Sequence, residues 1–356
     1  MPVGLPLKTT YANGDVFSAS DINDTNGTVN LVGQTNNFYA GKNAIINGDF
    51  RISQRGTTFT NPANAAYNLD RFSVVYDGTI TSHTVSQQTF TPGTAPVAGY
   101  EGANFARWAI TTNGTSTYRL FVQRIEDVRK YAGQTVTFSF WIKADSARTL
   151  TNATYGQNFG SGGSGTVEST FTLSTNSLTT SWQRITGTAT FPSISGKTIG
   201  TGSNVFIYLS FPTAGTFDTW GWQLEAGSTA TAFQTATGTI QGELAACQRY
   251  YQRLDSTDNN YTPFMFGAGT STTNIRFFAN LPVTMRTNGN PTVSAIGTWG
   301  TGNNNATLTA VVGGTMRNKN TLLVDFTTNS ATVQRSAYSL EANNTASAII
   351  QIDSEL

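Results

Sequence analysis

The chain of 356 residues contains one histidine and one cysteine. A single cysteine excludes an intramolecular disulfide, and the two residues together are too few for a zinc site of the Cys/His type. Any triad that needs a histidine has only His83, which lies in a polar, strand-like stretch. Cys247 lies on an apolar stripe, where a small thiol packs well. We therefore expect no enzymatic activity, no cofactor and no metal.

Charged residues are also scarce, at 12% of the chain against about 25% in an average soluble protein. Lys and Arg number 21 and Asp and Glu number 20, so the net charge is +1. A charge this close to zero creates no field that attracts nucleic acid or an acidic membrane surface. No apolar run approaches the roughly 20 residues of a membrane-spanning helix, and the first residues lack the pattern of a secretory signal. We expect neither a nucleic-acid partner nor membrane insertion.

What the chain does contain is period-two alternation, interrupted by Gly, Asn and Pro. In the segment 135–142, Val136, Phe138, Phe140 and Ile142 alternate with Thr, Ser and Trp. The segments 205–211 and 277–285 alternate in the same way. This pattern is typical of short antiparallel strands that bury one face, and many such strands indicate sandwiches or barrels.

Two segments depart from the alternation. In the segment 18–33, Ser18 and Asp21 fit a capping box, and Ile22, Val29 and Val32 lie on a thin apolar stripe. In the segment 238–254 the apolar residues repeat at spacings of 4, 3, 4 and 3, which predicts a short helix with a coiled-coil-like seam. The members of that seam are Ile240, Leu244, Cys247, Tyr251 and Leu254.

These patterns divide the chain into four parts. Residues 1–43 form an extended or partly helical arm, residues 44–237 a first β domain, residues 238–254 a connector helix and residues 255–356 a second β domain. Neither helical stripe is long enough to be stable alone, so each must pack on something. One interpretation is a subunit interface formed by Ile22, Val29, Val32, Ile240, Leu244 and Tyr251. The alternative is that the connector helix lies on its own β domain.

An ordered series of motifs resembles a group of structural proteins of tailed bacteriophages, namely tail fibres and other virion appendages. The series comprises NGDVFSASDIND (13–24), NAIINGDF (43–50), GQTVTFSFWIK (133–143), FDTWGWQLEAG (217–227), GELAACQRYYQ (242–252) and ASAIIQIDSEL (346–356). The resemblance covers nearly the whole chain. It implies an attachment arm, which docks on other virion proteins, followed by β domains that face outward. Appendages of this kind usually assemble as homotrimers.

The first domain of that group is similar to jelly-roll carbohydrate-binding modules. The resemblance therefore implies an all-β fold, with a jelly-roll β-sandwich, a connector helix and a second β-sandwich. Many such modules bind a structural calcium through an acidic residue just after the NGDF turn and an Asp pair in the closing strand. Here Arg51 follows the turn, and Asp218 is followed by Thr219. Both departures argue against the calcium, which needs six to eight oxygen ligands.

Several aromatic residues lie opposite the apolar face that the alternation assigns to their strands. Phe121, Trp141, Trp182 and Tyr208 form this set, and Arg184 lies beside Trp182. Bare Trp side chains on a sheet are costly, so something should cover them. Three interpretations remain open: a sugar-binding face, a subunit interface, or a one-residue register error that makes them core. By contrast Trp220, Trp222 and Leu224 alternate in the closing strand, and we expect them to share one buried face.

The function that we expect is that of a structural component of a tailed-phage virion, a tail-fibre-like or head-fibre-like appendage made in the bacterial host cytoplasm. Its first β domain would recognise host-surface polysaccharide. The alternatives are a collar or decoration protein without a ligand, and a polysaccharide depolymerase.

Overall fold

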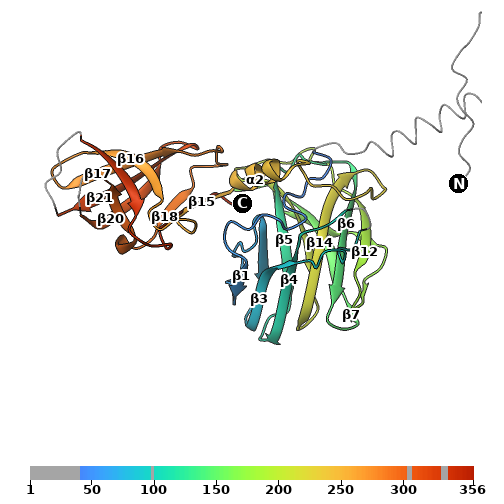
Figure 1. Cartoon of the computed structure of the whole chain (residues 1–356). Helices are drawn as coiled ribbons and strands as arrows, with labels where there is room; N and C mark the ends of the chain where they lie inside the picture. Colours follow the sequence, from blue (N-terminus) through green and yellow to red (C-terminus); the bar gives the residue numbers. More distant parts are fainter. Residues whose placement is uncertain (1–40, 98–99, 303–306, 330–335) are drawn as a thin grey trace, which may run out of the picture.

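The structure, a computed structural model, describes residues 41–97, 100–302, 307–329 and 336–356. Almost the whole predicted arm, with its candidate interface residues Ile22, Val29 and Val32, lies outside the described residues. The rest forms two all-β domains, blue to yellow and orange to red in Figure 1. None of the helices in the described ranges has the length and apolarity needed to cross a bilayer.

The first domain is built from two antiparallel sheets and a two-stranded ribbon. Its strands are β1 (Thr58–Thr60), β2 (Phe72–Tyr76), β3 (Ile80–Thr89), β4 (Asn104–Asn113), β5 (Arg119–Glu126), β6 (Thr135–Ala144), β7 (Arg148–Thr149), β8 (Asn152–Asn158), β9 (Val167–Thr170), β10 (Thr172–Leu173), β11 (Ser177–Leu178), β12 (Gln183–Thr190), β13 (Asn204–Ser210) and β14 (Gly215–Ala226). One sheet has the order β1-β3-β4-β14-β6-β12-β10 and the other β2-β5-β13-β8-β9, while β7 pairs with β11. The crossovers give a jelly-roll sandwich, as expected.

The core between these sheets follows the alternation of the sequence. Val136, Phe138, Phe140 and Ile142 of β6 are fully buried in it. The opposite strand β13 contributes Val205, Ile207 and Leu209 in the same way. Burial of such large side chains contributes about 1.5–3 kcal/mol each to the stability of the domain.

Strand β14 does not bury its two tryptophans on one face, contrary to the prediction. Trp222 and Leu224 lie in the core between the sheets, whereas Trp220 lies in a second aromatic cluster on the other side of β14. The reason is a β-bulge between Trp220 and Gln223, where Gly221 adopts φ +66°. An extra residue in one strand inverts the side-chain alternation beyond it.

The connector helix α2 spans Ile240–Gln248, and the Thr239 side chain caps its first turn. It packs on the first domain, because the buried Glu243 carboxylate accepts hydrogen bonds from the backbone N–H groups of Asn47 (2.8 Å) and Thr237 (2.7 Å). The alternative in which the helix lies on its own β domain is therefore the one observed.

The predicted helix was too long at its C-terminal end. Residues Tyr251–Asp255 form strand β15, in which Tyr251 is buried. Consequently the five seam residues share no face, and Ile240 and Leu244 remain 42% and 36% exposed. Pairing with a distant strand outweighed the local helical pattern.

The second domain contains strands from the remaining part of the chain. They are β15, β16 (Pro263–Gly269), β17 (Asn274–Asn280), β18 (Asn290–Val293), β19 (Trp299–Gly302), β20 (Leu308–Met316), β21 (Thr321–Thr328), β22 (Ala337–Ala342) and β23 (Ile349–Asp353). A three-stranded sheet, β15-β23-β18, packs on a six-stranded sheet, β19-β22-β16-β17-β21-β20, so this domain is a second β-sandwich.

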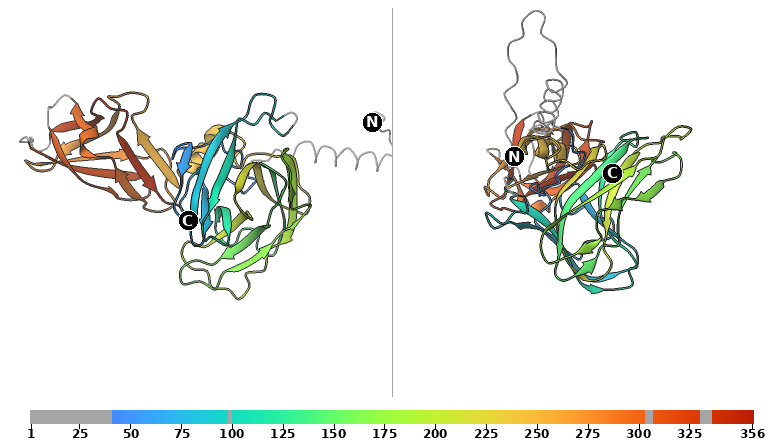
Figure 2. Two further views of the ribbon diagram at one scale, coloured as in Figure 1. Left: turned by 90° about the horizontal axis from the view of Figure 1, so that it is seen from below. Right: turned by 90° about the vertical axis from the view of Figure 1, so that its right-hand side faces the viewer.

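The last described residues join the two domains, as the position of the C-terminus in Figure 1 and Figure 2 shows. The Glu355 carboxylate forms ion pairs with Arg71, whose side chain is 1% exposed, and with Arg55 (3.3 Å). Arg71 also stacks on Tyr250, with its guanidinium carbon 3.4 Å from the ring centroid. The Tyr67 hydroxyl donates to the carbonyl oxygen of Leu356 (3.0 Å). Side chains of the first domain thus hold the end of the second.

Candidate ligand-binding cleft

The outward face of the five-stranded sheet carries an aromatic shelf. In β13, Val205, Ile207 and Leu209 point into the core, so the alternation turns Phe206 and Tyr208 outward, where both are half-buried. Their rings are parallel within 3°, and their centroids lie 6.2 Å apart. Together the two rings offer a flat apolar surface on the outward face of the sheet.

A glycine on the neighbouring strand makes room for this shelf. Gly156 of β8 is the direct partner of Phe206, and a Cβ atom at this position would overlap the Phe206 ring. The missing side chain lets the ring lie flat across β8 rather than stand away from the sheet. The orientation of the shelf is therefore fixed by the backbone.

Tyr208 is oriented by a carboxylate. Its hydroxyl donates a hydrogen bond to Glu168 of β9, two strands away. Burial and this hydrogen bond raise the pKa of Tyr208 to about 12, so the phenol is neutral at physiological pH. Glu168 itself is exposed, and a carboxylate has about four acceptor positions. It can accept further hydrogen bonds from a ligand.

The rim of the cleft is held by Asp77. Its carboxylate accepts hydrogen bonds from the Thr117 hydroxyl (2.6 Å), the Thr117 N–H (2.7 Å) and the Tyr118 N–H (3.1 Å). The Thr117 hydroxyl is the main cause that lowers the pKa of Asp77 to about 2. This arrangement presents the Tyr118 ring, which is 42% exposed, at the edge of the shelf.

Two adjoining cavities follow this face. One, of about 500 Å³, is lined by Tyr208, Tyr118 and Glu168 among others, and the second, of about 590 Å³, is lined mainly by Thr, Ser and Asn side chains of the segment 170–176. Thr151 and Asn152 line both, so the two cavities are neighbours, and they are called the cleft together.

The lining of the cleft is uncharged apart from one carboxylate. Among the described residues that line the two cavities, Glu168 is the only ionisable carboxylate and no side chain is cationic. Aromatic rings offer faces for C–H groups, while hydroxyl and amide groups offer both donors and acceptors. A ligand with alternating apolar and hydroxyl surfaces would be complementary to such a lining.

Of the residues predicted from the sequence, Tyr208 lies in the cleft and Phe121 does not. Phe121 is 2% exposed and stacks on Phe72, with ring centroids 5.2 Å apart, so its assignment to an outward face was wrong. Strand β5 turns two polar side chains inward beside it. Gln123 exchanges hydrogen bonds with the backbone of Ile46, and Arg119 donates to backbone carbonyl oxygens.

Trp141 lies on the face of β6 opposite Phe140, as predicted, but the protein itself covers it. It is 7% exposed and packs on Trp220 and Phe233 in the second aromatic cluster. Phe233 belongs to the covering segment, residues 228–236, which follows β14. This arrangement is neither a sugar-binding face, nor a subunit interface, nor the result of a register error. The predicted register of Trp141 is correct, and a segment of the same chain covers its ring.

Trp182 and Arg184 belong to the same region and are separate from the cleft. Trp182 packs on Phe90 and Phe105 with centroids 5.5 and 5.4 Å apart. The Arg184 guanidinium lies 4.6 Å from the centroid of Trp141 and donates to the Thr231 carbonyl oxygen of the covering segment. Neither Trp182 nor Arg184 lines the cleft, so a role of these residues in ligand binding stays a prediction.

Sequence reasoning did not select Phe206, Tyr118 or Glu168. The alternation of β13 places Phe206 beside Tyr208, and this signal was available. Tyr118 lies before β5 begins and has no periodic partner. Glu168 reaches Tyr208 only because β9 pairs with β8 and β8 with β13, which is a tertiary relationship.

The residues at the positions where many jelly-roll carbohydrate-binding modules bind calcium do not fit that ion. The Asp218 carboxylate is bound by the Arg107 guanidinium in two hydrogen bonds of 2.7 and 2.8 Å, and Lys143 lies at 3.5 Å. Arg51 lies 3.4 Å from Asp49. The described part of the chain contains no group of three His, Cys, Asp or Glu residues arranged for a metal. Cations of the protein therefore occupy the surroundings of these carboxylates.

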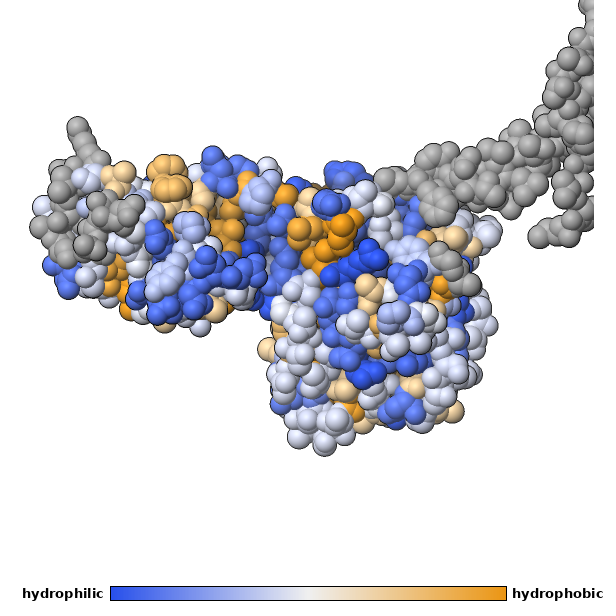
Figure 3. Space-filling view, in the orientation of Figure 1, coloured by the Kyte–Doolittle hydropathy of each residue, from blue (hydrophilic) through white to orange (hydrophobic). Residues whose placement is uncertain are grey.

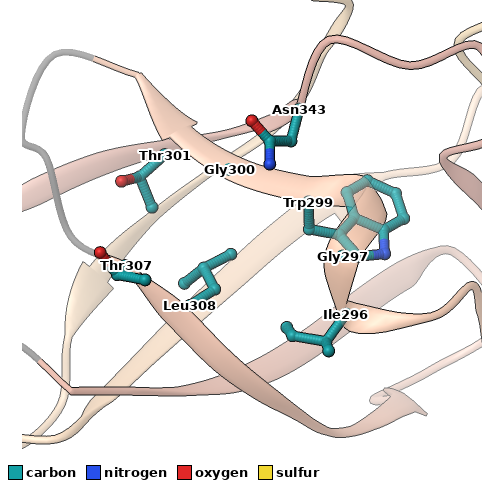
Figure 4. Close-up of a pocket in the computed structure, with 8 residues that line it drawn as sticks. All are labelled: Ile296, Gly297, Trp299, Gly300, Thr301, Thr307, Leu308 and Asn343. Atoms are coloured by element: carbon teal, nitrogen blue, oxygen red, sulfur yellow. The ribbon is translucent and has the colours of Figure 1, made fainter.

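A further cavity of about 420 Å³ lies in the second domain (Figure 4). Trp299 lies on one side of it and Asn343 above Gly300, as the close-up shows. The Trp299 ring is 3% exposed, and its N–H donates to the Ser294 carbonyl oxygen (3.2 Å). Its ring serves the core of the second domain rather than a ligand, so the cleft of the first domain is the better candidate.

Comparisons with known proteins give a restricted picture. No family model and no curated protein matches the chain. Among solved structures, a CBM4 module has 20% identity and a TM-score of 0.30, and the match covers 51% of this chain and 98% of the module. The CBM22-1 xylan-binding domain of Paenibacillus barcinonensis Xyn10C has 10% identity and a TM-score of 0.30, with 54% and 98% covered.

A third solved structure comes from a bacteriophage. The enzymatically active domain of tailspike protein 4 of bacteriophage CBA120 has 14% identity and a TM-score of 0.32, and the match covers 52% of this chain and 22% of that one. TM-scores near 0.3 do not establish that two proteins share a fold. The jelly-roll assignment is drawn from the sheets of the chain itself.

Proposed function

We propose that the cleft over β13 binds a host-surface polysaccharide and that the chain is a structural component of a tailed-phage virion. The aromatic shelf of Phe206 and Tyr208 carries the binding part of this proposal, and its Tyr208 ring lines the cavity together with hydroxyl and amide groups. Sugar rings present C–H faces that stack on aromatic rings, and their hydroxyls need donors and acceptors beside them.

The virion part of the proposal is supported by the series of motifs that resembles tail-fibre and head-fibre appendages. In it the arm of residues 1–43 docks on other virion proteins, and the β domains point outward as part of a homotrimer. The chain would be made in the host cytoplasm and carried on the particle. Mass spectrometry of purified particles tests this part, and absence of the chain from them would exclude it.

We further propose that binding occurs without catalysis. Most glycosidases use two carboxyl groups about 5–9.5 Å apart, and the described lining of the cleft contributes Glu168 alone. Incubation with capsular or cell-wall polysaccharide should therefore leave its chain length unchanged. Shortened fragments would identify the chain as a depolymerase instead.

The binding test uses the full chain on a glycan array and in host-cell adsorption. Tyr208→Ala should reduce binding about five- to tenfold, because a stacked ring contributes roughly 1–1.5 kcal/mol. Tyr261→Ala is the matched control, since Tyr261 is 58% exposed and lies in the second domain. Equal binding by both variants would place the ligand outside the cleft, and no binding by the unmodified chain would leave a collar or decoration protein without a ligand.

A further inference from the structure

The aromatic shelf alone does not distinguish one sugar from another. Phe206 and Tyr208 offer flat ring faces, and sugar rings of every kind present C–H groups that stack on such faces. In the view of Figure 3 the first domain is mainly hydrophilic, and apolar residues gather instead at the domain junction and on the second domain. The polar and charged groups around the shelf therefore decide which sugars are accepted.

The charge at the edge of the shelf is negative. Glu168 of β9 is the direct partner of Gly156, and Gly156 is the direct partner of Phe206. The Tyr208 hydroxyl donates to the same carboxylate. Strand pairing thus places the exposed Glu168 beside any sugar ring that stacks on the shelf. The carboxylate of Asp77 at the rim adds a second negative charge, although it already accepts three hydrogen bonds.

Two arginines of β5 adjoin the shelf, and both are bound elsewhere. Arg124 is the direct partner of Phe206 on the side away from β9, and its guanidinium donates to the hydroxyls of Tyr67 (3.4 Å) and Ser73 (3.2 Å). Arg119 is 4% exposed and donates to backbone carbonyl oxygens. Neither arginine lines the cleft, so no cation there balances the carboxylate.

An acidic sugar would consequently meet a like charge and no counter-charge. A carboxylate or sulfate on the ligand would lie beside Glu168, and juxtaposed like charges cost free energy. The hydroxyl and amide groups of the segment 170–176 are neutral, so an acidic unit in the second cavity would lose water without gaining an ion pair. A sugar hydroxyl or ammonium group, by contrast, can donate to Glu168.

We propose that the cleft accepts polysaccharides of neutral or amino sugars and rejects acidic ones, and that Glu168 determines this selection. The inference rests on the proposed glycan-binding function and narrows its substrate class. Polymers of uronic or sialic acids would then lie outside the range of receptors that this chain recognises.

The test compares the full chain with two variants on an array of neutral, amino and acidic glycans. The unmodified chain should bind neutral or amino members about fivefold or more tightly than acidic ones, as expected for like charges about 4 Å apart in water. Glu168→Gln removes the charge and keeps an acceptor for the Tyr208 hydroxyl. It should remove most of this preference. Asp258→Asn is the matched control, because it removes an exposed carboxylate of the second domain and should leave the preference unchanged.

A matched pair of ligands isolates the charge. The neutral glycan that binds best is compared with its oxidised form, in which primary hydroxyls have become carboxylates. The unmodified chain should bind the oxidised form about fivefold more weakly, and the difference should shrink in Glu168→Gln and at 1 M salt, where the Debye length is about 3 Å.

Three results separate this inference from the function on which it rests. Tighter binding of acidic glycans by the unmodified chain, lost in Tyr208→Ala, would overturn the selection and leave glycan binding in the cleft intact. A preference that stays unchanged in Glu168→Gln would overturn the role of Glu168. No binding to any member of the array would remove the proposed function itself, and this inference with it.

Discussion

The guanidinium of Arg71 lies flat over the ring of Tyr250, at 3.4 Å from its centroid, while the same group is paired with Glu355. Arg71 belongs to the first domain, Tyr250 to the end of the connector and Glu355 to the last residues of the second domain. One buried cation therefore contacts all three parts of the chain.

Arg71→Met should destabilise the protein and separate the two domains. Removal of one partner of a buried ion pair costs about 3–5 kcal/mol, because the other charge is left without compensation. Calorimetry should then show two melting transitions in place of a joint one. Arg129→Met is the control, since its ion pair with Asp127 is solvent-exposed and should contribute less than about 1 kcal/mol. Equal effects of the two substitutions would refute the special role of Arg71.

Gly221→Ala should disrupt the bulge that sends Trp220 and Trp222 to opposite faces. The left-handed backbone costs about 1–2 kcal/mol for alanine, and the new Cβ would lie 2.7 Å from the Trp141 ring. Gly196→Ala is the matched control, because φ is +72° there and no atom lies within 4 Å. Urea denaturation should show a clearly larger loss for Gly221→Ala, and similar losses would mean that the Trp141 ring moves aside at no cost.

Asp49 should make stability depend on pH. It is buried, and this burial raises its pKa from 3.8 to about 6. The folded state therefore binds the proton more tightly than the unfolded chain, and the resulting stabilisation is full below pH 3.8 and is lost as pH rises through 6. Asp49→Asn should be about 2–3 kcal/mol more stable than the unmodified chain at pH 8 and nearly equal to it at pH 4. A pH-independent difference in melting temperature would contradict this assignment.

Gly156→Ala should weaken ligand binding without removing any aromatic group. The new methyl group would displace the Phe206 ring from β8 and so break the flat shelf that it forms with Tyr208. We expect about a tenfold loss of affinity for any glycan that the unmodified chain binds, measured by calorimetry. Gly165→Ala provides the comparison, because a Cβ there meets open space. Unchanged affinity in Gly156→Ala would exclude Phe206 from the binding surface.

The sequence predicts which strand faces form the core of the first domain better than it predicts what packs on their outward faces. The alternation in β6 and β13 identifies the buried faces because each inward position there is apolar. It fails in β5, where Gln123 is buried and finds its partners in the backbone of Ile46, 77 residues away. It also fails at Gly221, because a bulge leaves no periodic signal. The cleft could not be predicted in full for a similar reason, since Tyr208 and Glu168 are brought together only by the pairing of β13 with β8 and of β8 with β9.

The covering segment gives the first domain a third apolar layer outside its two sheets. Hydrogen bonds attach this segment to β14: Thr231 donates to the Glu225 carboxylate, and the Gln234 N–H donates to the Gln223 side chain. The side chain that the segment packs on the sheet, Phe233, is aromatic. Release of these few hydrogen bonds would lift the segment while the sandwich beneath stayed intact. The amides of this segment should accordingly exchange with deuterium well before those of β6. The fluorescence of Trp141 and Trp220, which the segment covers, should change before the main melting transition.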